Sequence, residues 1–445
     1  MLYWFYLRFL GTQELSSECN KLVSTFIFIV GTSQIIFIVS STFYVLHVLD
    51  LVGFAQLGVL ITIVMVTQAI LDYPSGVLGD WLGQRWVIVV AYVCYALSFL
   101  LLSWAGSFVD LALVYVLMGV GSSQESGAFR TWFDNNYKVL AAGQDGDRGT
   151  YKLLFSRVSV IFQVTSSLAF LVGGFLSTWF GRTTVFRWQV VGLTLVAFLT
   201  LALVKDHSDV ERAVPSLRSY FSLLAEGVAV MGRSRVLLLT ILGWIIGSTG
   251  LMVWGRLVLM PFYLSYTGSD AGVSIFRYVS WLVGIVMTFP SGWLAKRVSN
   301  HVLPWLLVLF TSLFFGGFAL LTTFFPMGDN RFQPIPIALT LAIFVLTDTL
   351  HITANLLLNS LFVDIIPDRN RNSIYSLIPT LATLIYAPLL IFHGWIISNL
   401  GVEFSLALSV VYGFVGGIVM YFGLQTTKVS PLDLEEEVPD RNGDS

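Results

Sequence analysis

Four polar residues share one face of an otherwise apolar stretch in the last third of the chain. The stretch FVLTDTLHITANLLLNSLF contains Asp348, His351, Asn355 and Asn359. Their spacing of three and four residues places them on one side of an α-helix. Aspartate and histidine can each carry a proton, and such groups are costly inside a membrane helix unless they face a polar interior. The pattern predicts a site for a proton or a polar solute. The alternative is that the four groups only form hydrogen bonds between helices.

Two further polar residues lie within apolar stretches of the first half. Glu125, in the stretch 109–133, is a candidate coupling carboxylate. Gln34, in the middle of the stretch 22–46, is a candidate contact with a solute cavity. Helix packing explains Gln34 equally well, because buried amides often hydrogen-bond to neighbouring helices in membranes.

Arg277 and Trp281 share a helical face in the stretch 272–294. A guanidinium in that position can pair with an acid or recognise a carboxylate or phosphate with two parallel hydrogen bonds. It can also extend towards the membrane surface instead. Trp281 either packs over a solute or belongs to the core. Arg256 lies near the outer end of another apolar stretch, and we expect it to extend to the interface.

The composition indicates the surroundings of these residues. Of the 445 residues, 56% are hydrophobic and 11% are charged, and the mean hydropathy is +0.81. A soluble domain has about 25% charged residues, so much of this chain must face lipid. A net charge of -2 without a basic cluster argues against nucleic-acid binding.

Stretches of about 20 apolar residues are long enough to cross a bilayer as helices. Twelve occur here, which predicts an all-α membrane protein with twelve transmembrane helices: 22–46, 54–78, 86–104, 109–133, 155–179, 184–204, 236–264, 272–294, 302–325, 337–362, 374–398 and 402–424. The chain is accordingly divided into an N-terminal interfacial segment (1–20), a six-helix half (21–204), a cytoplasmic linker (205–235), a second six-helix half (236–424) and an acidic tail (425–445).

Lysine and arginine predict the orientation, because loops on the cytoplasmic side carry an excess of both. With the two termini inside, the outer side holds only Arg182, Arg187 and Arg331. The linker and the loop between the fourth and fifth stretches are rich in basic residues. We therefore expect a cell-membrane protein with both termini in the cytoplasm.

A repeat relates the two halves. YPSGVLGDWLGQR (Tyr73–Arg85) and FPSGWLAKRVSNH (Phe289–His301) occupy corresponding positions at the inner ends of the second and eighth stretches. Two parallel six-helix repeats are typical of one class of secondary transporter.

The first copy resembles the signature of the major facilitator superfamily, which is G-x-x-x-D, a basic residue, then x-G and two or three basic positions. The matching residues are Gly76, Asp80, Gly83 and Arg85; Trp81 and Gln84 replace basic residues. The resemblance implies the two-half fold of that family and a cytoplasmic latch centred on Asp80. It also implies an acid partner for Arg85 on the fourth helix.

Asp134 is the candidate acid for Arg85, and Asp72, one turn before the motif, is assigned to the same cytoplasmic gate. A short loop capped by Asp80 without a latch is the simpler alternative.

The sequence gives little support for catalysis or metal binding. Cys19 and Cys94 are far apart, and the five histidines are scattered without metal-ligand spacing. We expect no metal, no cofactor and no enzymatic activity.

These features predict a secondary active transporter that moves a small organic solute by alternating access. We expect a monomer in the lipid bilayer, coupled to protons, with efflux favoured over uptake. The alternatives are a facilitated or anion uniporter without proton coupling, and a non-transporting sensor or scaffold on the same fold.

Overall fold

The computed structural model describes residues 2–205, 228–229, 231–366 and 371–425, and all regular structure within them is helical. Eleven helical segments in this part of the chain are long and apolar enough to cross a membrane. Long helices are the expected outcome, because a helix satisfies its own backbone hydrogen bonds where no water is available. The predicted linker 205–235 and tail 425–445 lie largely outside the described residues.

The helices fall into two compact units. The first unit contains the chain through α8 together with residues 268–278, and the second contains α10 to α11 and the chain from Val279 onward. Helix α12 (Asp270–Ala295) therefore begins in the first unit and continues in the second.

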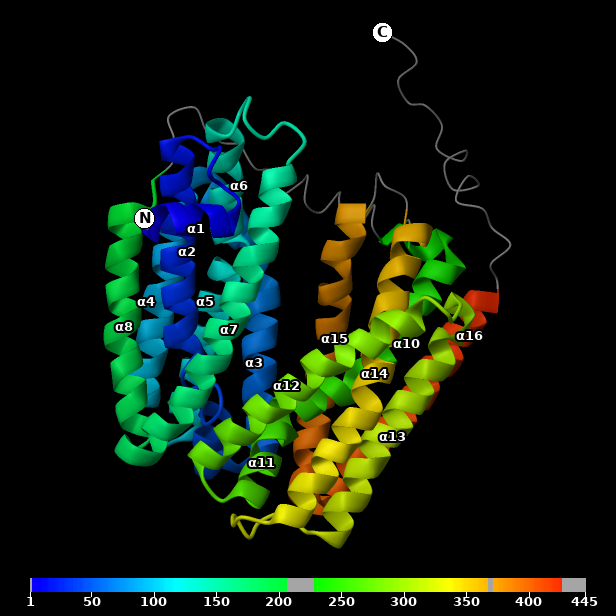
Figure 1. Ribbon diagram of the computed structural model, residues 1–445. Coiled ribbons are helices and arrows are strands. Elements are labelled where there is room, and N and C mark those ends of the chain that lie inside the picture. Colours follow the sequence, from blue (N-terminus) through cyan, green and yellow to red (C-terminus); the bar gives the residue numbers. More distant parts are fainter. Residues whose placement is uncertain (1, 206–227, 230, 367–370, 426–445) are drawn as a thin grey trace. The chain divides into compact units, whose positions relative to one another are not determined.

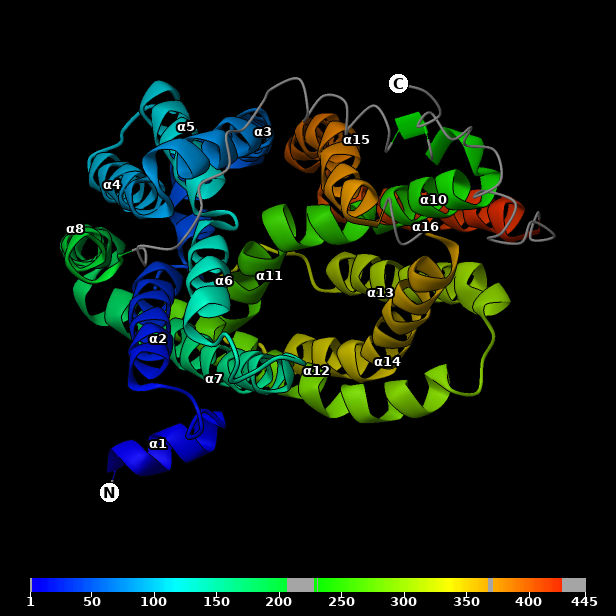
Figure 2. The ribbon, with the colours of Figure 1, turned by 90° about the horizontal axis from the view of Figure 1, so that it is seen from above.

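In the described part of the chain, the first unit contains eight helices and the beginning of α12 (Figure 1). They are α1 (Leu2–Leu10), α2 (Ser17–Ile38), α3 (Tyr44–Leu82), α4 (Gln84–Leu102), α5 (Phe108–Glu125), α6 (Ala128–Leu140), α7 (Gly149–Phe180) and α8 (Arg182–Leu203). Helix α5 packs against α3 and α4, and α2 packs against α7 and α8, as the view in Figure 2 also shows.

Two helices of the first unit differ from expectation. Helix α3 begins at Tyr44, before the predicted 54–78, and contains a non-helical Gly53 with φ 74° and ψ 175°. The predicted helix 109–133 is wrong as a single element, because it divides into α5 and α6. Gly127, with φ 81°, adopts a left-handed conformation that glycine tolerates and that ends a helix. Glu125 is consequently the last residue of α5.

The second unit contains the rest of α12 and the remaining described helices. These are α10 (Arg235–Val253), the π-helical turn η1 (Trp254–Val258), α11 (Leu259–Thr267), the 3-10 turn η2 (Asn300–Val302), α13 (Leu303–Phe324), α14 (Pro334–Ile365), α15 (Arg371–Leu400) and α16 (Val402–Gln425).

Glycines let α10 and α16 approach closely. A Cβ atom added to Gly243 would lie 2.6 Å from the carbonyl oxygen of Gly416, so neither position has room for a side chain. Small residues at a helix interface allow such backbone contact in membranes. Gly243 and Gly416 therefore account for the close approach of α10 and α16.

Candidate functional site

The polar face of α14 forms as the residue spacing predicts. The side-chain nitrogen Nδ2 of Asn355 lies 3.0 Å from Nε2 of His351 and donates to the His351 carbonyl at 3.1 Å. The imidazole also packs on the Phe310 ring, with 4.8 Å between centroids. Asn355 and Phe310 together hold the His351 ring in one orientation. Asn359, one turn further along, is exposed.

Asp348 lies one turn before His351 and faces a glycine on α12. A Cβ atom built on Gly284 would be 3.7 Å from Oδ2 of Asp348. Within the described residues, no hydrogen bond or ion pair reaches this carboxyl group. The structure thus places a half-buried acid beside a glycine of α12.

A further polar pair in the second unit was missed by the sequence analysis. The hydroxyl groups of Ser248 on α10 and Tyr386 on α15 lie 2.8 Å apart. Ser248 and Tyr386 lie on different helices, 138 positions apart, so no periodic signal joins them. Trp281, which the sequence analysis did single out, is half-buried on α12.

In the first unit, Glu125 is half-buried and accepts a hydrogen bond from the Tyr95 hydroxyl at 2.9 Å. Tyr95 packs against Phe37 of α2, with 4.9 Å between ring centroids. Gly121 leaves room for the tyrosine ring, because a Cβ atom there would lie 2.7 Å from it. Glu125 is therefore positioned by α2, α4 and α5. Gln34 is half-buried on α2.

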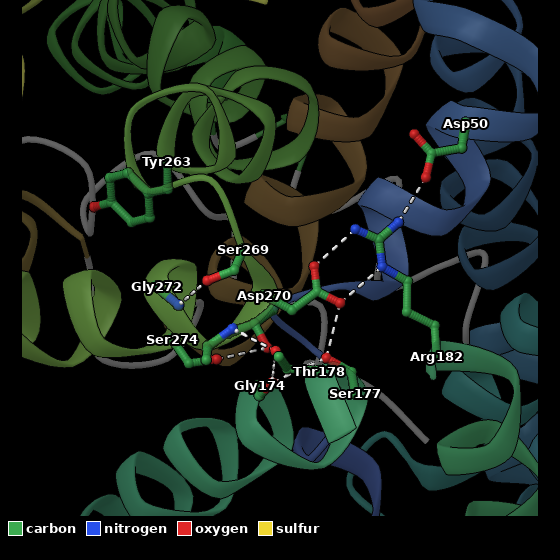
Figure 3. A network of polar contacts seen from close by, with 12 residues as sticks. Asp50, Gly174, Ser177, Thr178, Arg182, Tyr263, Ser269, Asp270, Gly272 and Ser274 are labelled. Atoms are coloured by element: carbon green, nitrogen blue, oxygen red, sulfur yellow. Dashed lines mark hydrogen bonds and ion pairs between the residues drawn. The ribbon is translucent and has the colours of Figure 1, made fainter. Parts of the chain in front are cut away.

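The beginning of α12 is held to the first unit by a network of charged and hydroxyl groups (Figure 3). Arg182 donates to Asp270 twice, from Nε at 2.8 Å and from Nη2 at 2.7 Å. Its third nitrogen contacts Asp50 at 2.6 Å, and the Ser177 hydroxyl donates to Asp270 at 2.8 Å. The network joins α3, α7, α8 and α12. No part of it follows from sequence periodicity.

Arg277 continues the same attachment. Its Nη1 donates to the Ser41 hydroxyl at 2.9 Å, and the guanidinium lies over the Phe170 ring at 4.6 Å from the centroid. Ser274, one turn earlier, donates to Thr42 at 3.2 Å. In this structure the Arg277 guanidinium contacts a hydroxyl group and an aromatic ring of the first unit.

The expected pair of Arg85 and Asp134 is wrong in this structure. Arg85 donates instead to the carbonyl oxygen of Leu201 on α8. Asp134 accepts a hydrogen bond from Tyr151 and lies 3.7 Å from Arg130. The break between α5 and α6 explains the change, because it separates Asp134 from the helix that the prediction assumed.

The remaining gate residues are placed only in part. Asp72 accepts a hydrogen bond from Ser126, which connects α3 to the break between α5 and α6. Gly83 has φ 92° and makes the turn between α3 and α4. The side chains around Gly76 and Asp80 lie outside the described part of the chain, and so does any contact of the predicted latch that they would make.

The loop between α6 and α7 contains a well-connected carboxylate that the sequence analysis did not single out. Burial raises the pKa of Asp145, but hydrogen bonds from the Thr150 backbone, the Tyr137 hydroxyl and the Tyr151 backbone outweigh it, so the pKa is lowered. The donors lie 2.9, 2.8 and 2.9 Å from the carboxylate. Asp145 thus fixes the beginning of α7.

Comparisons with known proteins agree on one family. The sequence model of the Major Facilitator Superfamily matches residues 22–388. A probable 4-methylmuconolactone transporter of Cupriavidus pinatubonensis (strain JMP 134 / LMG 1197) is 24% identical over 311 residues, covering 63% of this chain and 68% of that protein.

Solved structures agree in fold. The nucleoside transporter NupG gives a TM-score of 0.69 at 13% identity, covering 92% of this chain and 100% of the other. A bacterial homologue of the human lysosomal transporter Spinster gives a TM-score of 0.67 at 14% identity, covering 92% and 98%. At such identities the likeness concerns the fold alone.

Proposed function

The chain belongs to the Major Facilitator Superfamily and is therefore a multi-pass membrane transporter rather than an enzyme, and from this premise we propose that it moves a small organic solute together with protons. Transport proceeds by alternating access, and Asp348 is the residue that exchanges the proton. Efflux is the favoured direction. The lactone named for the Cupriavidus relative is the first solute to test.

The unpaired carboxyl group of Asp348 carries this proposal. A proton changes a conformational equilibrium only if the two states bind it with different affinity. A carboxylate already neutralised by a guanidinium would gain little from protonation. Asp348 has no such partner in the part of the chain that the structure describes, so its charge can change during transport.

The neighbours of Asp348 support the same role. His351 and Asn355 extend the polar face along α14, and Phe310 keeps the imidazole in place. An ordered polar face lowers the cost of holding a solute, because its groups need not be reorganised on binding. Glu125, held by Tyr95, is proposed as a second coupling carboxylate, in the first unit.

A transport assay in liposomes tests the proposal. Purified protein is reconstituted with a pH gradient of either sense, and proton movement is recorded on addition of 4-methylmuconolactone and a panel of other small solutes. We expect solute-dependent proton flux in the wild type and none in Asp348→Asn. Asp364→Asn, an exposed acid at the end of the same helix, is the matched control. Normal coupled flux in Asp348→Asn would remove Asp348 from the mechanism.

The orientation is part of the proposal, with both termini in the cytoplasm. Phe332, 72% exposed in the loop before α14, then lies outside the cell. A cysteine introduced at this position should react with a membrane-impermeant thiol reagent applied to intact cells. Reaction only after the cells are opened would reverse the topology.

A further inference from the structure

The membrane-crossing segment Arg235–Thr267 is interrupted by a π-helical turn. Residues Trp254–Val258 form this turn between α10 and α11. A π turn inserts an extra residue into the helical repeat, and such turns are frequent at functional sites. Trp254 begins the turn and is buried against α13, with ring centroids 4.4 Å from Phe318 and 5.4 Å from Phe314.

Arg256 lies on the opposite side of this turn. Two residues correspond to about half a helical turn, so Arg256 points away from the α13 surface on which Trp254 packs. Gly255 and Arg256 are exposed, whereas Leu257 and Val258 are buried. A Cβ atom added to Gly255 would meet no atom within 4 Å. Arg256 is thus an exposed residue of the π turn, next to a glycine that borders open space.

The guanidinium of Arg256 makes no hydrogen bond or ion pair with any residue that the structure describes. Arg277 differs, since Ser41 and Phe170 occupy its guanidinium. Among the described spanning helices of the second unit, Arg256 and Asp348 are the two charged residues away from the helix ends. No ion pair joins them. A cation is costly in such a segment and calls for an anionic partner.

We propose that Arg256 binds the carboxylate group of a small organic anion. A guanidinium matches a carboxylate with two parallel hydrogen bonds, which gives both strength and orientation. The inference rests on the proposed transport function and adds the class of solute. With Arg256 balancing the anion and Asp348 carrying the proton, the second unit would hold a solute anion and a proton with no net charge added.

Equilibrium binding to the purified full-length protein in lipid nanodiscs tests this assignment. The probes are benzoate, phenylacetate and levulinate, each compared with its neutral methyl ester. We expect the wild type to prefer the carboxylates. Arg256→Gln should weaken carboxylate binding about tenfold or more, because a charge-assisted hydrogen-bond pair is lost, and should leave the weak ester binding unchanged.

Two matched variants sharpen the result. Arg256→Lys keeps the charge without the planar fork and should bind carboxylates with intermediate affinity. Arg187→Gln removes an exposed arginine from α8 in the first unit and should bind like the wild type. Thermal unfolding of each variant confirms that it is folded before binding is compared.

Several outcomes would overturn the assignment. These are a wild type without preference for carboxylates over esters, an unchanged carboxylate affinity in Arg256→Gln, and an equal loss for acids and esters. The liposome assay separates this failure from failure of the transport proposal. If Asp348→Asn loses coupled flux but carboxylate binding does not depend on Arg256, only the anion site is refuted. If binding depends on Arg256 but Asp348→Asn keeps coupled flux, only the proton site is refuted.

Discussion

Two aspartates, one at the beginning of α12 and one in the middle of α14, differ sharply in their surroundings. Asp270 is 9% exposed and accepts hydrogen bonds from Arg182 and Ser177. Arg182 is itself held by Asp50. Asp348 is half-buried and has no hydrogen-bond or ion-pair partner within the described residues.

We expect this difference to separate a charge that holds helices together from one that takes part in transport. Breaking the pair between a buried carboxylate and a guanidinium strongly destabilises a protein, because the remaining charge is left buried and unpaired. Its contacts therefore favour one arrangement of the helices they join. A carboxyl group without partners contributes little to stability and remains free to bind a proton. Mutation of the two sites should consequently affect different properties.

Arg182→Gln should have the largest effect on stability. It leaves Asp270 buried without its cation, and we expect a loss of about 3–5 kcal/mol. Denaturant unfolding of the protein in mild detergent measures the loss. Asp50→Asn is the control, because the Asp50 side chain is 66% exposed and a surface ion pair contributes about 0–1 kcal/mol. Equal effects of the two variants would show that the Asp270 pair does not behave as a buried one.

Gly174→Ala should have the next largest effect. The added Cβ atom would lie 1.9 Å from the Ser274 hydroxyl and 2.5 Å from the Asp270 carbonyl oxygen, so α7 and α12 would have to separate. Overpacking of this kind costs about 1–3 kcal/mol, measured by the same unfolding assay. Gly146→Ala, where a Cβ atom meets nothing within 4 Å, should be close to neutral. A neutral Gly174→Ala would mean that the attachment of α12 is loose.

Asp145→Asn tests a third carboxylate that lies outside the spanning segments. Its lowered pKa means that the ionised form stabilises the folded loop. The stabilisation is complete above the unfolded-state pKa, about 3.9, and is lost as the pH falls through the folded-state value. We expect the variant to lose about 1 kcal/mol near neutral pH.

The difference between wild type and Asp145→Asn should shrink below about pH 4. Unfolding curves recorded between neutral and acidic pH measure it. Asp147→Asn is the comparison, because Asp147 is exposed and accepts one backbone hydrogen bond, from Gly149. A difference that stays constant with pH would assign the effect to altered packing rather than to charge.

Asp348→Asn should have the smallest effect on stability, within about 0.5 kcal/mol of the wild type. No contact within the described residues is lost, and asparagine is nearly the same size. The same variant should lose coupled transport in the liposome assay. A destabilisation comparable with that of Arg182→Gln would show that Asp348 is a structural charge after all, and the contrast between the two aspartates would disappear.

Local sequence patterns determined the parts of this protein that depend on neighbouring residues. Apolar length predicts the spanning helices, because a helix must cover the hydrocarbon layer. Residue spacing predicts the common face of Asp348, His351 and Asn355, because the helical repeat is constant along an unbroken helix. The family resemblance likewise rested on one short motif around Gly76 and Asp80.

Tertiary structure decided what depends on distant residues or on a break in the helical repeat. Arg182 and Asp270 are separated by 88 positions, and their pairing follows from how α8 and α12 pack. Because the helix breaks before α6, Asp134 accepts a hydrogen bond from Tyr151, and Arg85 donates to the Leu201 carbonyl oxygen. A π turn at Trp254–Val258 interrupts the stretch that hydropathy predicts as one regular helix. Hydropathy and periodicity describe a regular helix, so they cannot specify where packing interrupts it or which side chains it brings together.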